Sequence, residues 1–269
     1  RRCQRSGSSL KPIGASRRCF VQMSIDMSKA VSSNRAEPTY RFQRVHPALV
    51  TGHVLMVKAQ RADPVQPFVQ QSPLDSACGV HVITAILSIT ALAKPSALAN
   101  MSRRQHGIAA AVWRAFGDTY FSGVYAPDWV DRFESLGLPL ELTAKYRPHD
   151  AVDAHVLDWL MQGSLVALVL HSVRHARTKH WCLAVGVDGA FVDRKHEVDT
   201  VLLLDPATDS PVFAAHNARL RLKGHAVPKR PAKSEKTCRP RPVTWLYESL
   251  DWNAEEVHLQ AAVRVRRTP

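Results

Sequence analysis

The sequence lacks the features that define several specialised classes of protein. Its five cysteines are odd in number and form no CxxC pair, so we expect neither a disulfide scaffold nor a four-ligand zinc site of the usual spacing. The most apolar run covers residues 80–93 and includes His, Thr and Ser, which makes it too short and too polar to cross a membrane. No apolar segment typical of a secretory signal peptide occurs near the start. We expect a soluble protein without a membrane span, either cytoplasmic or secreted by a route without a visible signal peptide.

The positive charge is concentrated in two stretches. Apolar residues make up 45% and charged residues 22% of the 269 residues, which excludes a fully disordered, collagen-like or coiled-coil chain. The formal net charge of +13 comes from residues 1–25, with six basic residues and no acid, and residues 219–241, with nine basic residues and one acid. The rest of the chain is close to neutral, and no aromatic residues interleave the charges as in single-strand binders. We do not expect nucleic acid as the main partner; an acidic partner would dock on these two segments.

The chain divides into an extension and one domain. We predict that residues 1–40 are a basic, disordered N-terminal extension and that residues 41–269 form a single domain. Residues 219–242 contain four prolines and little apolar periodicity, which predicts a basic, Pro-rich insert or linker. Hydrophobic spacing predicts helices that precede a mostly antiparallel sheet, the pattern of the α+β class. The expected helices are 78–94, 103–116, 126–136 and 151–162; the expected strands are 48–57, 138–146, 164–170, 181–187 and 201–205, and 243–249 and 257–265 are strands or a helix.

Cys78 lies in the first turn of a predicted helix. Pro73 keeps the preceding chain extended, and Asp75 is a residue type favoured at helix starts. A thiol at this position feels the positive end of the helix dipole, which lowers its pKa toward the reactive thiolate. The Gln71 side-chain amide, just upstream, and the Cys78 backbone N–H could together bind a developing oxyanion.

A predicted hairpin places a histidine beside an aspartate. His180 stands at the start of one strand, and Asp205 stands at the end of the next and is followed by Pro206. If the two strands pair antiparallel, the start of the first lies beside the end of the second. Asp188 lies at the opposite end of this hairpin, about 25 Å from His180 at the usual rise per residue. The geometry therefore favours Asp205 as the group that orients the imidazole, by the logic of Cys–His–acid triads.

The order of these motifs resembles that of papain-like cysteine peptidases. Gln71, a Cys-Gly pair at Cys78, a His-Trp pair at His180 and an Asp-Pro pair at Asp205 are most similar to the bacteriocin-processing double-glycine peptidase family and its free-standing bacterial relatives. The resemblance covers about residues 65–210. It includes the segments GVYAPDWVDRFESLGLPLELT and SLVALVL.

This resemblance implies a papain-like α+β fold, with an N-terminal catalytic helix packed on a mostly antiparallel sheet. It implies a cysteine peptidase in which Cys78 is the nucleophile, His180 the general base and acid, Asp205 the orienter and Gln71 the oxyanion donor, with no cofactor and a peptide or protein as substrate. The chain has Val80 where the family usually has Pro. Its Gln-to-Cys spacing is also about one residue longer, which leaves Gln70 as an alternative to Gln71.

Other interpretations of these residues stay open. The same constellation supports amidase, deamidase, transglutaminase or acyltransferase chemistry, and an inert Cys78 would leave a peptide- or nucleic-acid-binding module. Cys182 shares a strand face with His180, but it lies within an apolar run and is expected in the core. His171 and His175, with His180, span a loop without a nearby acid or cysteine at ligand spacing, so no metal site is expected.

Overall fold

A computed structural model describes residues 40–58, 64–175, 179–192, 194–223, 243–251 and 253–268. The predicted extension, apart from Tyr40, lies outside the described residues, as do Cys3, Cys19 and Cys238. The predicted insert also lies outside them from residue 224 to residue 242. Residues 219–222 belong to a strand.

Five α-helices are present in the described part of the chain, most of them close to the predicted ranges. None of these helices combines the length and the apolar character that crossing a membrane requires. The α-helices are α1 (Cys78–Ile89), α2 (Pro95–Leu98), α3 (Gly107–Phe116), α4 (Ala126–Glu134) and α5 (Val152–Met161), and the short 3-10 helices are η1 (Met101–Arg103) and η2 (Gly117–Thr119).

The described strands form one large sheet and one small one. The segment expected as a single strand at 48–57 forms the separate two-stranded sheet, made of β2 (Leu49–Val50) and β3 (Met56–Val57). The large sheet contains β1 (Tyr40–Val45), β4 (Leu140–Tyr146), β5 (Leu165–Ser172), β6 (Lys179–Val192), β7 (Lys195–Leu204), β8 (Ala218–Leu222), β9 (Trp245–Ser249) and β10 (Glu255–Arg267).

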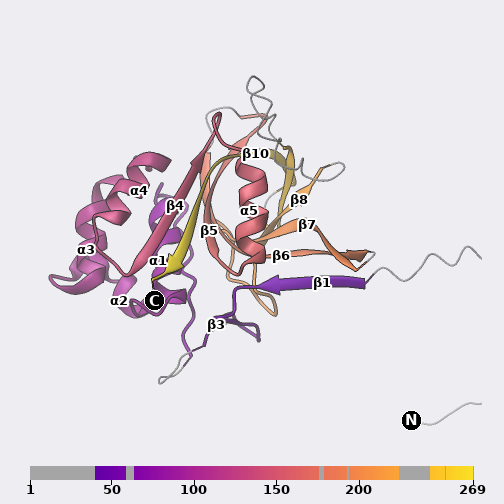
Figure 1. Cartoon of the computed structure of the whole chain (residues 1–269). Coiled ribbons are helices and arrows are strands. Elements are labelled where there is room, and N and C mark those ends of the chain that lie inside the picture. Colours follow the sequence, from indigo (N-terminus) through magenta and orange to yellow (C-terminus); the bar gives the residue numbers. More distant parts are fainter. Residues whose placement is uncertain are drawn as a thin grey trace, which may run out of the picture. The chain divides into compact units, whose positions relative to one another are not determined.

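Six of these strands close into a barrel. The strand order is β6-β5-β10-β9-β8-β7, and β7 pairs with β6 to complete the circle. All of these pairings are antiparallel, while β1 and β4 extend the sheet from β6 and β10. Figure 1 shows α3 and α4 grouped to one side of β4, with the barrel strands on the other side.

The expected papain-like fold, an N-terminal catalytic helix packed on a mostly antiparallel sheet, is therefore wrong. The physical reason lies in the C-terminal third. The segments 243–249 and 257–265, expected as strands or a helix, are both strands, β9 and β10. β9 pairs with β8 and with β10, and β10 pairs with β5, so each of the six barrel strands has a partner on both sides and the barrel closes.

Side chains of the central strands alternate between two cores. In β6, Trp181 and Leu183 belong to the core shared with α1, α3 and α4, whereas Cys182 and Ala184 belong to the barrel interior, to which α5 also contributes. Strands buried on both faces read as continuous apolar runs, which explains the uninterrupted hydrophobic segments in the sequence. The same alternation directs residue 180, two positions before Cys182, to the interior side at one end of the barrel.

Candidate active site

The N-terminus of α1 presents Cys78 to a cleft. The Asp75 carboxylate accepts hydrogen bonds from two backbone N–H groups, including that of Ala77 at 3.0 Å, and so shapes the turn before the helix. Gly79 permits close packing here, because a Cβ at this position would lie 2.8 Å from Cγ1 of Val124. The helix is buried over most of its length, so the thiol is held by rigid packing.

The thiol of Cys78 has a pKa below the ordinary value for cysteine. Burial is the largest single influence and raises this pKa, whereas the His180 side chain lowers it. The backbone N–H groups of Trp181 and Gly79 lower the pKa further. A lowered pKa enlarges the thiolate fraction at neutral pH, and the thiolate is the nucleophilic form.

The β6–β7 hairpin brings His180 and Asp205 into contact, as the strand pattern predicts. The two strands pair antiparallel with Leu183 opposite Leu204, and Nε2 of His180 lies 2.7 Å from Oδ1 of Asp205. Because Nε2 faces the carboxylate, Nδ1 remains for the Cys78 thiol. Burial alone would lower the pKa of His180. The Asp205 carboxylate outweighs it and, with a smaller contribution from Cys182, holds this pKa well above the ordinary range.

Asp205 lies at the centre of a buried hydrogen-bond network. Its side chain is 1% exposed. Oδ2 accepts hydrogen bonds from the Tyr247 hydroxyl at 2.6 Å and from the Cys182 thiol at 3.2 Å, and Oδ1 also accepts from the backbone N–H of Ala207 at 2.7 Å. Burial raises the pKa of Asp205, but the charge and hydrogen bond of His180, together with the Tyr247 hydroxyl, lower it to about 2. The carboxylate therefore stays ionised at neutral pH.

Cys182 lies in the barrel core, as expected, and its side chain is fully buried. The sequence did not predict that Cys182 contacts Asp205. Burial raises the pKa of this thiol, and the nearby carboxylate raises it further, more than the positive charge of His180 lowers it. Cys182 therefore stays protonated and donates its S–H to the carboxylate.

Among the described residues, His180, Cys182 and Asp205 are the one group with the spacing of metal ligands, with ligand atoms within 4.8 Å of one another. These side chains also bond to one another, since the Cys182 thiol donates to Oδ2 of Asp205 and His180 contacts Oδ1. His171 and His175, weighed as ligands in the sequence, are not members of this group.

Gln71 and Gln70 have different environments. Gln71 lines the cleft next to Cys78, and its Nε2 donates a hydrogen bond to the backbone oxygen of Asp75 at 2.8 Å. The amide carries a second N–H, so this bond does not exhaust its donors. Gln70 is exposed and donates to Asp209 at 3.0 Å. The structure therefore places Gln71, and not Gln70, beside the thiol.

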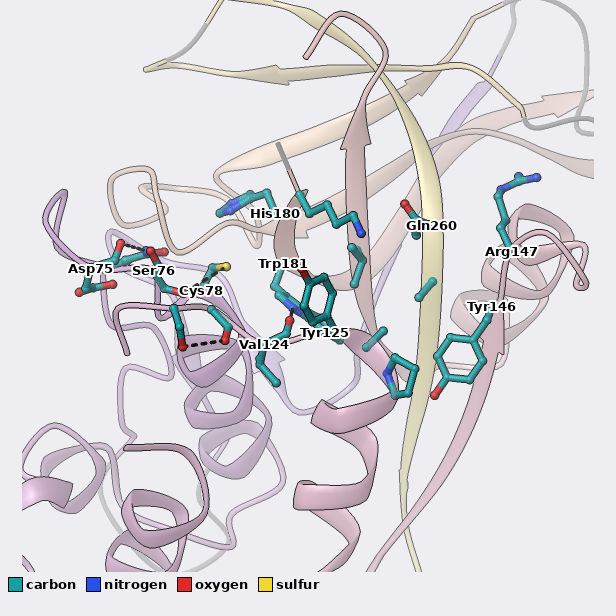
Figure 2. Close-up of a pocket in the computed structure, with 18 residues that line it drawn as sticks. Asp75, Ser76, Cys78, Val124, Tyr125, Tyr146, Arg147, His180, Trp181 and Gln260 are labelled. Atoms are coloured by element: carbon teal, nitrogen blue, oxygen red, sulfur yellow. Dashed lines mark hydrogen bonds between the residues drawn. The ribbon is translucent and has the colours of Figure 1, made fainter. Parts of the chain in front are cut away.

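Two cavities meet at the His180 side chain. The first has a volume of about 560 Å³ and is lined by Cys78, the segment 122–127, and residues of β4 and β10. Figure 2 shows Cys78 and His180 at one end of this cavity and Gln260, Tyr146 and Arg147 at the other. The second has a volume of about 620 Å³ and includes Asp205 and Tyr247. The cavities share Gln71, Lys179 and His180, so they adjoin at the histidine, and Cys78 lines the first of them.

Two other titratable residues, Asp188 and His81, do not take part in this centre. Asp188 pairs with Arg41 at 3.0 Å, at the other end of the hairpin. His81, on α1, contacts the backbone oxygen of Val69 at 3.1 Å instead of the thiol.

The sequence did not reveal Tyr247 or Asn217 as members of the site. Tyr247 lies 42 positions after Asp205, and only the barrel brings it there. Asn217 exchanges two hydrogen bonds with the backbone of Asp205, at 2.7 and 2.8 Å, and so fixes the position of this residue. Asn217 lies directly before β8, which pairs with β7, and this adjacency was the only sequence signal for it.

Comparison with known proteins identifies no family. No protein-family model matches the chain, and a search of curated proteins finds no significant match. Membership of the cysteine peptidase family therefore stays a prediction.

Proposed function

We propose that this protein is a thiol hydrolase that cleaves a peptide or isopeptide bond through an acyl-enzyme on Cys78. One observation carries the proposal: Nε2 of His180 lies 2.7 Å from Asp205, His180 and Cys78 line the same cavity, and the His180 side chain lowers the pKa of the Cys78 thiol in spite of burial. This is the relation between nucleophile, base and orienting acid that covalent acyl transfer requires. The motif order shared with cysteine peptidases supports a peptide or isopeptide as substrate.

The mechanism follows from the positions of these groups. The Cys78 thiolate attacks the carbonyl carbon, and the backbone N–H groups of the first turn of α1 and the free N–H of Gln71 stabilise the oxyanion. The imidazolium of His180 then gives its Nδ1 proton to the leaving amine as the C–N bond breaks. His180, now neutral, takes a proton from water, which attacks the thioester and releases the acid. Asp205 stays ionised throughout and stabilises the imidazolium.

The test compares the two thiols of the described chain. The wild type, Cys78→Ala and Cys182→Ala are treated at neutral pH with a peptide chloromethyl ketone, which alkylates an activated thiol irreversibly with loss of chloride, and the label is mapped by peptide mass spectrometry. We expect label on the Cys78 peptide of the wild type and of Cys182→Ala, and none in Cys78→Ala. Label that persists in Cys78→Ala, or that maps to Cys182, would overturn the assignment.

A further inference from the structure

A lysine without an acidic partner stands at the junction of the two cavities. Lys179 begins β6, directly before His180, and it lines both cavities. Its side chain is exposed, and its Nζ lies 5.0 Å from the centre of the Tyr125 ring. Within the described ranges, no carboxylate forms an ion pair with it. Its charge is therefore available to a ligand.

Three other charged groups of the cavities already have partners. Arg147, in the first cavity, is paired with Asp153 and donates to a backbone oxygen. The Asp75 carboxylate accepts two backbone N–H groups, and Glu255, in the second cavity, accepts the Ser172 hydroxyl. Lys179 is thus an uncompensated charge at the point where the cavities meet the catalytic histidine.

Arg174 adds a second positive charge on one side of this point. It is exposed and lines the second cavity together with Lys179. Asp205 does not oppose these cations, because it is buried and bonded to His180 and Tyr247. Lys179 and Arg174 therefore place two cations in the second cavity, whose Glu255 carboxylate accepts the Ser172 hydroxyl, and an anionic group can bind between these cations.

We propose that Lys179 binds an anionic group of the substrate, a carboxylate close to the scissile carbonyl, with Arg174 supporting it from the second cavity. The proposal rests on the proposed function, because it assigns a specificity to the thiol of the same site. Tyr125, which packs against the ammonium group, limits the positions that the lysine side chain can take. An acyl substrate with an acidic side chain or a free carboxylate beside the reacting bond satisfies this site.

A pair of alkylating reagents tests this charge without a known substrate. Iodoacetate and iodoacetamide both alkylate the Cys78 sulfur with loss of iodide, and they differ in the carboxylate that the first one carries. The rate of each reagent is measured on the Cys78 peptide for the wild type, Lys179→Ala, Lys179→Glu and Arg174→Ala. We expect the iodoacetate-to-iodoacetamide rate ratio to fall about threefold to tenfold in Lys179→Ala, further in Lys179→Glu and less in Arg174→Ala.

The matched control is Lys145→Ala. It removes the same net charge, but Lys145 pairs with Asp150 and lines neither cavity, so the ratio should stay at the wild-type value. A ratio in Lys179→Ala equal to that of Lys145→Ala overturns this proposal and leaves the proposed function standing. Failure of both reagents to alkylate Cys78 in the wild type overturns the proposed function instead. Added salt should bring the ratios of the wild type and Lys179→Ala together, because surface charges are screened.

Discussion

The start of α1 and the interior of β6 each bring a thiol to the same histidine–aspartate pair, with opposite results. Cys78, at the helix start, is partly exposed, and the His180 side chain and backbone N–H groups lower its pKa. Cys182, inside the barrel, is fully buried and bonded to Asp205, and its pKa is raised. The imidazole has the stronger influence on the pKa of the first thiol, and burial together with the carboxylate has the stronger influence on the pKa of the second.

This difference shows that reactivity depends on which partner a thiol faces as well as on its distance from the pair. A thiolate is stabilised by an imidazolium and by backbone N–H groups, whereas a carboxylate favours the protonated thiol. The helix start supplies such N–H groups, and a strand in the interior of a barrel uses its own in the sheet. The geometry therefore assigns chemistry to Cys78 and support of Asp205 to Cys182.

Of the substitutions considered, removal of the His180 imidazole should change the reactivity of Cys78 most. In His180→Ala the Cys78 thiol loses the bond and the charge that lower its pKa, while burial still raises it. We expect alkylation of Cys78 by iodoacetamide at pH 6–7 to slow about tenfold to hundredfold, as the thiolate fraction falls. Stopped-flow or timed mass-spectrometric labelling measures this rate. The control His175→Ala, whose ring lines the second cavity, should stay within about twofold; an equal loss in both variants would contradict the assignment of His180.

Removal of the Tyr247 hydroxyl should have an intermediate effect. Tyr247→Phe deletes a 2.6 Å hydrogen bond to the Asp205 carboxylate, and bonds to charged groups contribute about 1.5–3 kcal/mol. The free energy of unfolding should fall by that amount at pH 7, and alkylation of Cys78 should change only a few-fold.

The pH dependence of Tyr247→Phe gives a second measurement. Asp205 has a lowered pKa in the folded state, so its ionisation contributes stability above the unfolded pKa, and this contribution is lost as the pH falls through the folded value of about 2. Without the hydroxyl the folded pKa rises, so acid unfolding should begin at a higher pH. Tyr120→Phe, whose hydroxyl makes no hydrogen bond with a described residue, is the control, and coincident acid-unfolding curves for the two variants would contradict the network.

Removal of the buried thiol should have the smallest effect on reactivity. In Cys182→Ala we expect Cys78 alkylation within about threefold of the wild type and a loss of about 1 kcal/mol of stability at pH 7, from the small cavity and the lost S–H bond. The raised pKa of Cys182 means that the folded state keeps its proton while the unfolded state loses it above about pH 9. Above this pH, the free energy of unfolding of the wild type therefore falls by up to about 1.4 kcal/mol per pH unit. The variant lacks this thiol and does not show this loss.

Urea unfolding of wild type and Cys182→Ala at pH 7 and pH 10 measures this difference. The stability deficit of the variant should narrow or reverse at pH 10. An equal stability deficit at the two pH values would mean that the pKa of Cys182 is not raised. That result would contradict the opposite pKa shifts of Cys182 and Cys78.

Local patterns were sufficient to predict part of the site. The helix start at Cys78 follows from residues 73–89 alone, and the contact between His180 and Asp205 follows from two strands joined by a short connection. Both predictions depend on residues that are close in sequence, and hydrophobic periodicity indicates directly whether such residues form a helix or a strand. Asp188 could be set aside for the same reason, because distance along a strand is known from its rise per residue.

The barrel and its contribution to the site were not predictable in this way. Closure depends on β10 pairing with β5, which precedes it by more than 80 residues, and on β9 pairing with β8 across the residues outside the structure. The register of those pairings decides that Tyr247 reaches Asp205. A one-residue shift would turn the tyrosine to the other face of its strand.

The sequence by itself determined the nucleophile's helix, the histidine–aspartate hairpin and the separation of the charge into two basic stretches, because these depend on local spacing and composition. Only the tertiary structure decided that the sheet closes, that Tyr247 and Cys182 bind the carboxylate, and that Lys179, which forms no ion pair with a described residue, lies where two cavities meet. These features arise from contacts between segments far apart in the chain. Such contacts are set by the packing of complementary surfaces, which no local pattern encodes.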